Sequence, residues 1–221
     1  MGAESGDFAL LYADDALLVL DKPAGLLSVP GRGAEKQDCL SARVQRHYPQ
    51  AQVVHRLDMA TSGLMLMARA TAVQRQLSKA FAERRIHKQY QAIVHGVIAP
   101  PLANAPDPWQ MIDLPMRLDW PNRPKSIIDV LGGKPSQTRW RWLAAGTIGE
   151  TTRLLLEPLT GRSHQLRVHL QALGHPILGD TLYASADVQA LASRLLLHAT
   201  RLCFVHPVSG ESLQFDSVVP F

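Results

Sequence analysis

Short apolar segments of strand length recur along this 221-residue chain, whereas the 3.6-residue periodicity of a helix appears in only three or four places. Strand-like segments occur at residues 8–12, 16–20, 52–54, 64–67, 88–97, 136–143, 152–157, 195–205 and 211–219. Because strands and helices do not alternate one to one, the pattern argues against a doubly wound α/β fold. It predicts an α+β fold. No apolar run approaches the roughly 20 residues that a membrane-spanning helix needs.

Three of the expected helices begin at residue types that accept hydrogen bonds from free backbone N–H groups. These are Asp38, Thr71 and Ser163. Basic residues on the first two helices suit a phosphate backbone, but a solvated surface explains them equally well. The third helix is expected to place His164, Arg167 and Gln171 on one polar face.

The domain organisation is expected to be simple. Residues 8–221 are predicted to form a single domain, preceded by a disordered N-terminus at residues 1–7. Residues 99–109 contain four prolines and no periodicity. They indicate a long connection within the domain, because the strand pattern resumes after them.

The charge favours a polyanionic partner. The net charge is +4, and 17 of the 23 basic residues are arginine, which suits phosphate and base edges. A compositional habit of the source genome remains an alternative. Cys39 and Cys203 lie in apolar contexts far apart, which fits free thiols in a reducing cytosol and predicts a cytoplasmic protein. They form no metal or redox motif.

Residues 55–63 place His55, Arg56 and Asp58 between two strand-like segments and before a Thr-Ser-Gly turn signal. Charge at such a junction is costly unless it is paired or used. Two interpretations stay open on this stretch alone. Either Asp58 and Arg56 form a structural pair that fixes a loop, or Asp58 is a functional acid.

Two further stretches suit contacts with RNA. On the strand at 88–97, alternation puts Lys88 and Tyr90 on one face, where the ring could stack on a base. The loop at 114–125 carries Arg123 and Lys125 near Trp120, basic residues interleaved with an aromatic. A half-buried strand tyrosine and an irregular surface loop are the alternative explanations.

Residues 160–176 form the third informative stretch. The helix start at Gly161, Arg162 and Ser163 suits an anion such as phosphate. Histidines at 164, 169 and 175 raise the question of a metal, but their spacing matches no standard zinc motif and no cysteine joins them. No metal site is therefore expected.

In their order along the chain, three of these stretches resemble motifs of the RluA family of pseudouridine synthases. Residues 55–58 with 61–63 resemble its catalytic-aspartate motif, 88–92 its tyrosine motif, and 161–167 with 174–180 its arginine motif. Weaker blocks extend the resemblance over roughly residues 8–221. Residues 120–125 and 133–135 resemble the compact, dual-specificity type that acts on transfer RNA and 23S ribosomal RNA. Residues 126–128 and 99–110 depart from that type, which bears on substrate choice.

The resemblance implies the pseudouridine-synthase catalytic fold: a largely antiparallel or mixed sheet, with flanking helices and loops around a central active-site cleft. It implies no cofactor, no metal and no membrane partner. Many relatives carry an S4-type RNA-binding domain before the catalytic domain, and this domain is expected to be absent here because only about seven residues precede the first expected strand. The expected partner is RNA, either 23S ribosomal RNA or transfer RNA or both, and the expected state is a monomer.

The resemblance also assigns roles to residues. Asp58 would be the catalytic carboxylate, Tyr90 a ring that stacks on the base and can accept a proton, and Arg167 the charge partner of Asp58. Arg56 would displace the target base. Further RNA-binding or base-flipping residues are expected to be His55, Lys88, Arg162, His164, Arg123 and Lys125.

Two functions from other classes remain as alternatives. One is a catalytically idle RNA-binding or chaperone module that uses the same basic loops. The other is a hydrolytic glycosidase, which normally needs paired carboxylates. No second acid accompanies Asp58 in its motif.

Overall fold

The computed structural model describes residues 4–5, 7–101 and 108–221. The chain divides into two compact units, one of Met1–Lys88 with Ala199–Pro220 and one of Gln89–His198 with Phe221. Strands β6 (His87–His95) and β12 (Leu197–Val205) each contain residues of both units. The sequence predicts one domain over residues 8–221. That statement about domain organisation stays a prediction, and each unit is described by itself.

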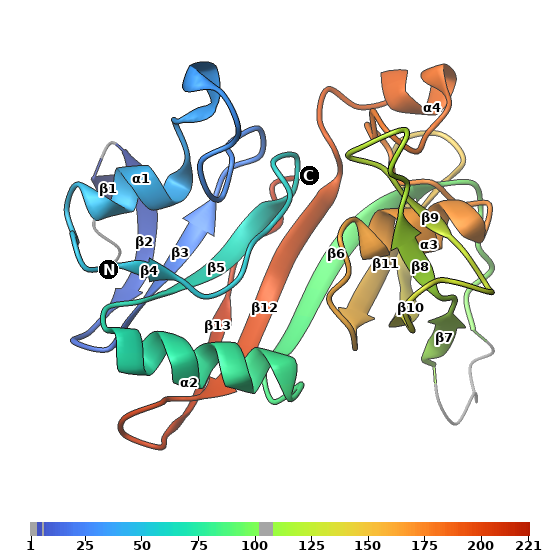
Figure 1. Ribbon diagram of the computed structural model, residues 1–221. Coiled ribbons are helices and arrows are strands. Elements are labelled where there is room, and N and C mark those ends of the chain that lie inside the picture. The colour runs from blue at the N-terminus through green and yellow to red at the C-terminus, as the bar shows by residue number, and fades with distance from the viewer. Residues whose placement is uncertain (1–3, 6, 102–107) are drawn as a thin grey trace. The chain divides into compact units, whose positions relative to one another are not determined.

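The first unit is built on a sheet with the strand order β1-β2-β3-β5-β12, with β13 beside β12 and β4 beside β5 (Figure 1). Its remaining strands are β1 (Glu4–Ser5), β2 (Phe8–Ala13), β3 (Leu17–Lys22), β4 (Gln52–Val53), β5 (Ser62–Ala68) and β13 (Ser212–Asp216). Glu4 and Ser5 pair with Ala9 and Phe8. The predicted disorder over residues 1–7 stays a prediction, and residues 1–3 and 6 lie outside the described residues.

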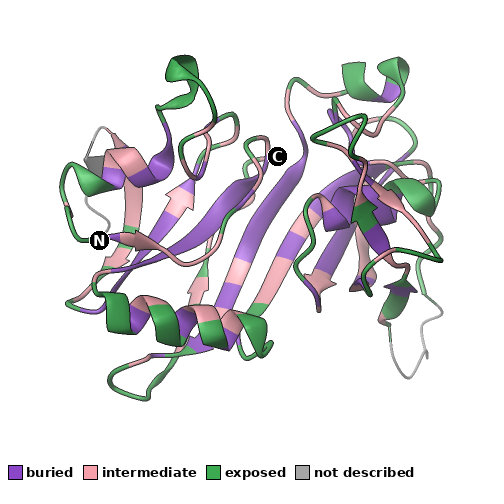
Figure 2. Cartoon of the chain, viewed as in Figure 1, coloured by how far each residue is buried: buried purple, intermediate pink, exposed green. Residues whose placement is uncertain are grey.

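Strand β5 is buried along its whole length, and its alternating side chains enter two different cores. Leu64 and Leu66 pack with Leu77 of helix α2 (Thr71–Ala82), whereas Met65 and Met67 pack in the cluster that contains residues of helix α1 (Leu40–Gln45). Figure 2 shows buried and exposed positions alternating around α2. This continuous apolar strand is the element that the first unit is assembled on.

The helix starts differ from the prediction at all three capping positions. Cys39, not Asp38, caps α1, and its sulfur accepts from the N–H of Ala42. Asp38 instead binds the guanidinium of Arg43. Helix α2 begins after Ala70, so Thr71 is its first residue and not its cap. A short 3₁₀ turn, η1 (Ala34–Lys36), precedes α1.

The second unit contains an antiparallel sheet in the order β6-β11-β10-β7. Its other strands are β7 (Gln110–Asp113), β10 (Gln137–Ala145) and β11 (Thr151–Pro158). Strands β8 (Met116–Leu118) and β9 (Ser126–Ile128) form a separate small sheet, where sequence analysis expected only a loop for residues 114–125. The expected connection at residues 99–109 falls largely on residues 102–107, outside the described part.

Helix α3 (Gln165–Ala172) packs against β9, β10 and β11, and the short helix α4 (Ala186–Ala190) follows it. The α+β class is confirmed. No helix in the described part of the chain has the length and apolar character that a bilayer-spanning helix requires.

Candidate active site

The loop that carries Asp58 lies between β4 and β5 in the first unit. Arg56 is exposed, Leu57 is buried, and Asp58 is half-buried. The N–H of Thr61 donates to the carbonyl of Asp58 at 3.1 Å, which closes a turn before β5 begins at Ser62. The acid therefore stands on a short loop fixed between a strand and a tight turn.

A second loop holds the peptide groups on both sides of Asp58. The Ser28 hydroxyl donates to the Leu57 carbonyl at 2.7 Å and accepts from the Leu57 N–H at 3.1 Å. The Met59 carbonyl accepts from the N–H of Gly25 at 2.8 Å and from the Lys22 ammonium at 3.1 Å. These contacts fix the backbone that presents the carboxylate.

Lys22 and Ser28 were not predicted as parts of the site. Lys22 is fully buried, and its ammonium also donates to the carbonyls of Pro23 and Leu26 at 2.8 and 2.7 Å. Three carbonyl acceptors satisfy a buried ammonium, so this lysine shapes the loop. A weaker family block at residues 22–27 includes Lys22, whereas no sequence signal pointed to Ser28.

His55 has an internal role, which changes its predicted assignment. Its Nε2 accepts from the N–H of Leu66 at 3.0 Å, and its ring packs at a tilt of 34° against the ring of Phe81 of α2, with centroids 4.5 Å apart. Burial, and then the nearby Lys88 charge, lowers the pKa of His55 to about 3. A ring that must accept at Nε2 stays neutral, so His55 is a poor phosphate contact.

Lys88 belongs to the same cluster. Its ammonium lies 5.7 Å from the centre of the Phe81 ring, and burial lowers its pKa. A cation over an aromatic face is stabilised where it stands. The His55 and Lys88 side chains both contact Phe81 of α2, and their predicted contacts with RNA stay predictions.

Tyr90 and helix α3 lie on the same face of the second unit's sheet. Tyr90 pairs with Leu156 of β11, and Leu156 pairs with Trp140 of β10, so these three side chains share one face. Thr138, two residues from Trp140, is on that face as well, and its hydroxyl contacts His169 of α3 at 2.9 Å. The helix that carries Arg167 thus covers the face to which Tyr90 points.

Arg167 is buried, although sequence analysis placed it on a polar helix face. Its Nε and Nη2 donate to the two carboxylate oxygens of Asp180 at 2.8 and 2.6 Å, a bidentate pair that is also buried. The guanidinium lies 5.1 Å from the centre of the Tyr183 ring. Asp180 is a partner that the motif contained but that sequence reasoning did not single out. Asp58 lies in the other unit, and its pairing with Arg167 stays a prediction.

His164 does not belong to the body of α3. It precedes the helix in the left-handed conformation, with φ of 57°, and takes the capping position predicted for Ser163. Its Nδ1 lies 2.7 Å from the hydroxyl of Tyr183. The predicted RNA contact is thus also a support for the ring beside Arg167.

The remaining predicted contacts are accessible. Arg162 is exposed, and its guanidinium donates to the Pro135 carbonyl at 3.3 Å. Arg123 is exposed and lies 4.5 Å from the centre of the Trp120 ring. Lys125 is half-buried at the end of the same loop.

The histidines of the arginine motif have separate partners. His169 contacts Thr138 and the Leu114 carbonyl, and burial lowers its pKa, whereas His175 contacts the His95 carbonyl. Within residues 4–5, 7–101 and 108–221, no group of three or more potential metal-ligating side chains is found.

Comparison with known proteins adds an independent result. A family model described as RNA pseudouridylate synthase matches residues 16–172, which include parts of both units. The chain is 49% identical over 212 residues to the dual-specificity RNA pseudouridine synthase RluA of Escherichia coli (strain K12), covering 96% of this chain and 93% of that protein. The corresponding Yersinia pestis protein is 47% identical, with 96% and 99% covered. The structure of human RNA pseudouridylate synthase domain containing 1 has a TM-score of 0.78 at 29% identity, covering 100% of this chain and 87% of that one.

Proposed function

We propose a mechanism and a substrate from the following premise: the chain belongs to the RNA pseudouridylate synthase family. It is an isomerase that converts uridine in RNA to pseudouridine. The N1–C1′ glycosidic bond breaks, the uracil turns, and C5 bonds to C1′ before it loses its proton. The observation that supports this function most strongly is the 49% identity over 96% of the chain.

Asp58 is the proposed catalytic carboxylate, acting at the junction of sugar and base. Its support is geometric. The Ser28 hydroxyl holds the peptide before it, and the Lys22 ammonium and the Gly25 N–H hold the carbonyl after it. A carboxylate on a backbone fixed from both sides keeps its position while the base turns.

Tyr90 and Arg167 are proposed to act on the same uridine as Asp58. Tyr90 stacks on the uracil ring and accepts the C5 proton. Arg167 supplies positive charge that keeps the carboxylate ionised. The bidentate pair with Asp180 and the Tyr183 ring fix the direction of the guanidinium.

The proposed RNA contacts are Arg56, Arg162, Arg123 and Lys125. Arg56 is exposed two residues before Asp58, where it can occupy the space left by the flipped uridine. Flipping costs a few kcal/mol, and contacts of the other cations with flanking phosphates offset this cost. His164 contributes to RNA binding indirectly, because its ring contacts the Tyr183 hydroxyl and holds the Tyr183 ring in place.

The proposed substrates are structured loops of transfer RNA, 23S ribosomal RNA or both. The curated relatives are named dual-specificity enzymes, which favours more than one RNA. A monomer in the cytoplasm is the proposed working state.

The decisive experiment compares pseudouridine-specific mapping of total RNA from cells with and without this gene, repeated with Asp58→Asn. With the variant, the pseudouridines that depend on this gene should be absent. The affinity of the variant for RNA should stay within about twofold of the wild type, because only the reacting group changes. Asp187→Asn, at an exposed position of α4, should behave as wild type. Product from Asp58→Asn would remove Asp58 from the mechanism. RNA binding by the wild type without pseudouridine would favour an idle binding module, and free uracil would favour a glycosidase.

Arg167 is tested with two substitutions. Arg167→Ala should reduce turnover more than RNA affinity, but it leaves the buried Asp180 carboxylate without its bidentate partner and can reduce folding. Arg167→Lys keeps the charge and loses the planar fork. A folded Lys variant with impaired turnover and normal affinity supports the role, whereas impaired affinity with normal turnover contradicts it.

A further inference from the structure

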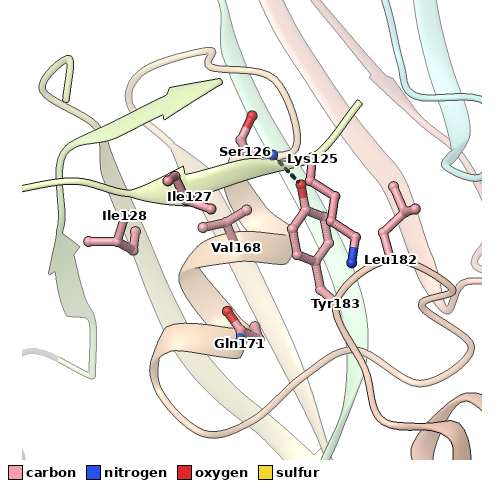
Figure 3. A pocket seen from close by; sticks show the side chains of 8 residues that line it. All are labelled: Lys125, Ser126, Ile127, Ile128, Val168, Gln171, Leu182 and Tyr183. Carbon is pink, nitrogen blue, oxygen red and sulfur yellow. Dashed lines mark hydrogen bonds between the residues drawn. The ribbon is translucent and has the colours of Figure 1, made fainter. Parts of the chain in front are cut away.

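A cavity of about 280 Å³ lies in the second unit beside β9 and α3. Its lining includes Lys125, Ile127, Val168, Gln171, Leu182 and Tyr183 (Figure 3). Asp58, Tyr90 and Arg167 do not line it. The volume is close to the lower end of the range of about 300–1,000 Å³ for small-molecule sites, which suits a single base better than a larger ligand.

The walls of this cavity are held in place by hydrogen bonds. The Tyr183 hydroxyl accepts from the N–H of Ser126 at 2.8 Å and contacts His164 at 2.7 Å. Asp180 accepts from the N–H groups of Leu182 and Tyr183 at 2.9 and 3.2 Å. The aromatic ring and its neighbours are therefore positioned before any ligand arrives, which lowers the entropy lost on binding.

Two polar groups of the lining have no partner in the part of the chain that the structure describes. The Gln171 amide makes no hydrogen bond there, and the Lys125 ammonium has no ion pair. An amide offers both a donor and an acceptor, as the edge of a base requires, and an ammonium suits a phosphate. Apolar side chains and the Tyr183 ring complete a surface for a flat, hydrogen-bonding group that carries negative charge.

The loop at the cavity has the character of an RNA-binding surface. Two residues before Lys125, the exposed Arg123 lies over the ring of Trp120, which is 63% exposed. Strand β9 supplies Ile127 and Ile128 to the lining.

We propose that this cavity binds the base of a second nucleotide of the substrate RNA, distinct from the reacting uridine. Gln171 reads the edge of the base, and Lys125 binds its phosphate. The site selects RNA loops in which that nucleotide is turned out of the stack. This inference rests on the proposed function.

The test uses a stem-loop oligonucleotide that spans a uridine identified by pseudouridine mapping. Each other loop nucleotide is made abasic in turn, and affinity is measured for the wild type, for Ile127→Trp, which fills the cavity, and for Gln171→Leu. One abasic position should weaken wild-type binding about tenfold, because a stacked base contributes on that scale. Ile127→Trp should bind the RNA that is abasic at that position and the intact RNA equally. For Gln171→Leu, the loss of affinity caused by the abasic position should be smaller than for the wild type.

Gln189→Leu, the same substitution at an exposed position of α4, should reproduce the wild-type pattern. If the variants show the full wild-type loss at every abasic position, the cavity does not hold a base, while the proposed function stands. Should Ile127→Trp fail to fold, Gln171→Leu decides alone. If mapping finds no modified uridine, both the function and this inference are overturned.

Discussion

At the scale of single residues, Gly63, beside the candidate active site, is a position where the backbone conformation and the lack of space both require glycine. Its φ is +110°, and a Cβ at this position would lie 2.3 Å from the carbonyl oxygen of Ala199. Gly63→Ala should therefore lower the free energy of unfolding by roughly 3 kcal/mol or more. Denaturant unfolding followed by circular dichroism measures the loss.

The control for this prediction separates strain from contact. Gly210 has a φ of +76° but open space where its Cβ would be. Gly210→Ala should cost only about 1 kcal/mol, the ordinary penalty of a left-handed residue. Equal losses for the two variants would show that the close approach to Ala199 is unimportant.

His55 gives a prediction about pH. Its pKa is about 3 in the folded protein and 6.5 as the ordinary value, so below pH 6.5 the unfolded chain binds a proton that the folded chain does not. Stability should fall by up to about 1.4 kcal/mol for each pH unit between 6.5 and 3, and should be fully present above 6.5. His55→Gln should flatten this part of the profile, measured by denaturant unfolding from pH 7 to 4.

The matched change for this experiment is His87→Gln, at an exposed histidine of β6. This variant should keep the wild-type profile. A profile for His55→Gln that is as steep as the wild type would mean that His55 does not set the acid sensitivity.

Sequence reasoning located the acidic motif, but it could not assign the direction of each side chain. His55 and Arg56 are both basic neighbours of Asp58, and both were predicted to contact RNA. Only the structure shows that the His55 ring accepts from the N–H of Leu66, which is distant in sequence. A main-chain donor carries no side-chain signal, so no sequence pattern reveals this contact.

At the scale of elements, the backbone just after α2 is strained at one residue, and a substitution by glycine can remove this strain. Arg84 has a φ of 60° in the position after the helix where glycine is usual, and the N–H of Arg85 donates to the Ala80 carbonyl at 2.8 Å to close the motif. Arg84→Gly should raise the stability by about 1 kcal/mol, seen as a higher melting temperature. Arg85→Gly, outside the left-handed region, should not stabilise, and an increase there would refute the explanation.

The loop that ends at Ser28 should act as a positioning element. Ser28→Ala removes both hydrogen bonds to the Leu57 peptide, which should lower kcat about tenfold or more while the affinity for RNA is maintained. Ser41 is equally buried, but among the residues that the structure describes its hydroxyl contacts only the sulfur of Cys39. Ser41→Ala should therefore leave kcat unchanged. Equal kcat values for the two variants would make the Ser28 contact merely structural.

The strands were predictable because alternation and apolar runs can be read directly from the order of the residues, as in β5 and β6. The helix caps were not, because a cap depends on the backbone conformation of one residue. His164 takes the cap of α3 in a left-handed conformation, which only a small share of non-glycine residues adopt, although histidine is enriched among them. Arg167 was expected at a polar surface, and it is buried because the loop at Asp180 covers it.

At the scale of the whole molecule, the candidate active-site residues are divided between the two units. Asp58 belongs to the first, and Tyr90 and Arg167 belong to the second. Each unit by itself presents only part of the set: a fixed carboxylate in one, a ring and a guanidinium on one sheet face in the other. The function therefore followed from motifs spread along the chain, and the matched residues 16–172 include all three side chains.

The balance of charge gives the last prediction. The net charge is +4, Arg56 is exposed and Lys125 is half-buried. Binding of RNA to these cations should release counterions, so the affinity for RNA should fall steeply as the salt concentration rises. In a plot of log affinity against log salt, Arg56→Gln and Lys125→Gln should each lower the magnitude of the slope by about one, as expected for one lost phosphate contact. Arg201→Gln removes the same charge, but Arg201 is paired with Asp216 at 2.6 Å. The slope of this variant should match the wild type, because counterion release depends on contact with phosphate and not on net charge. Equal changes for all three variants would indicate a diffuse field and no specific contacts.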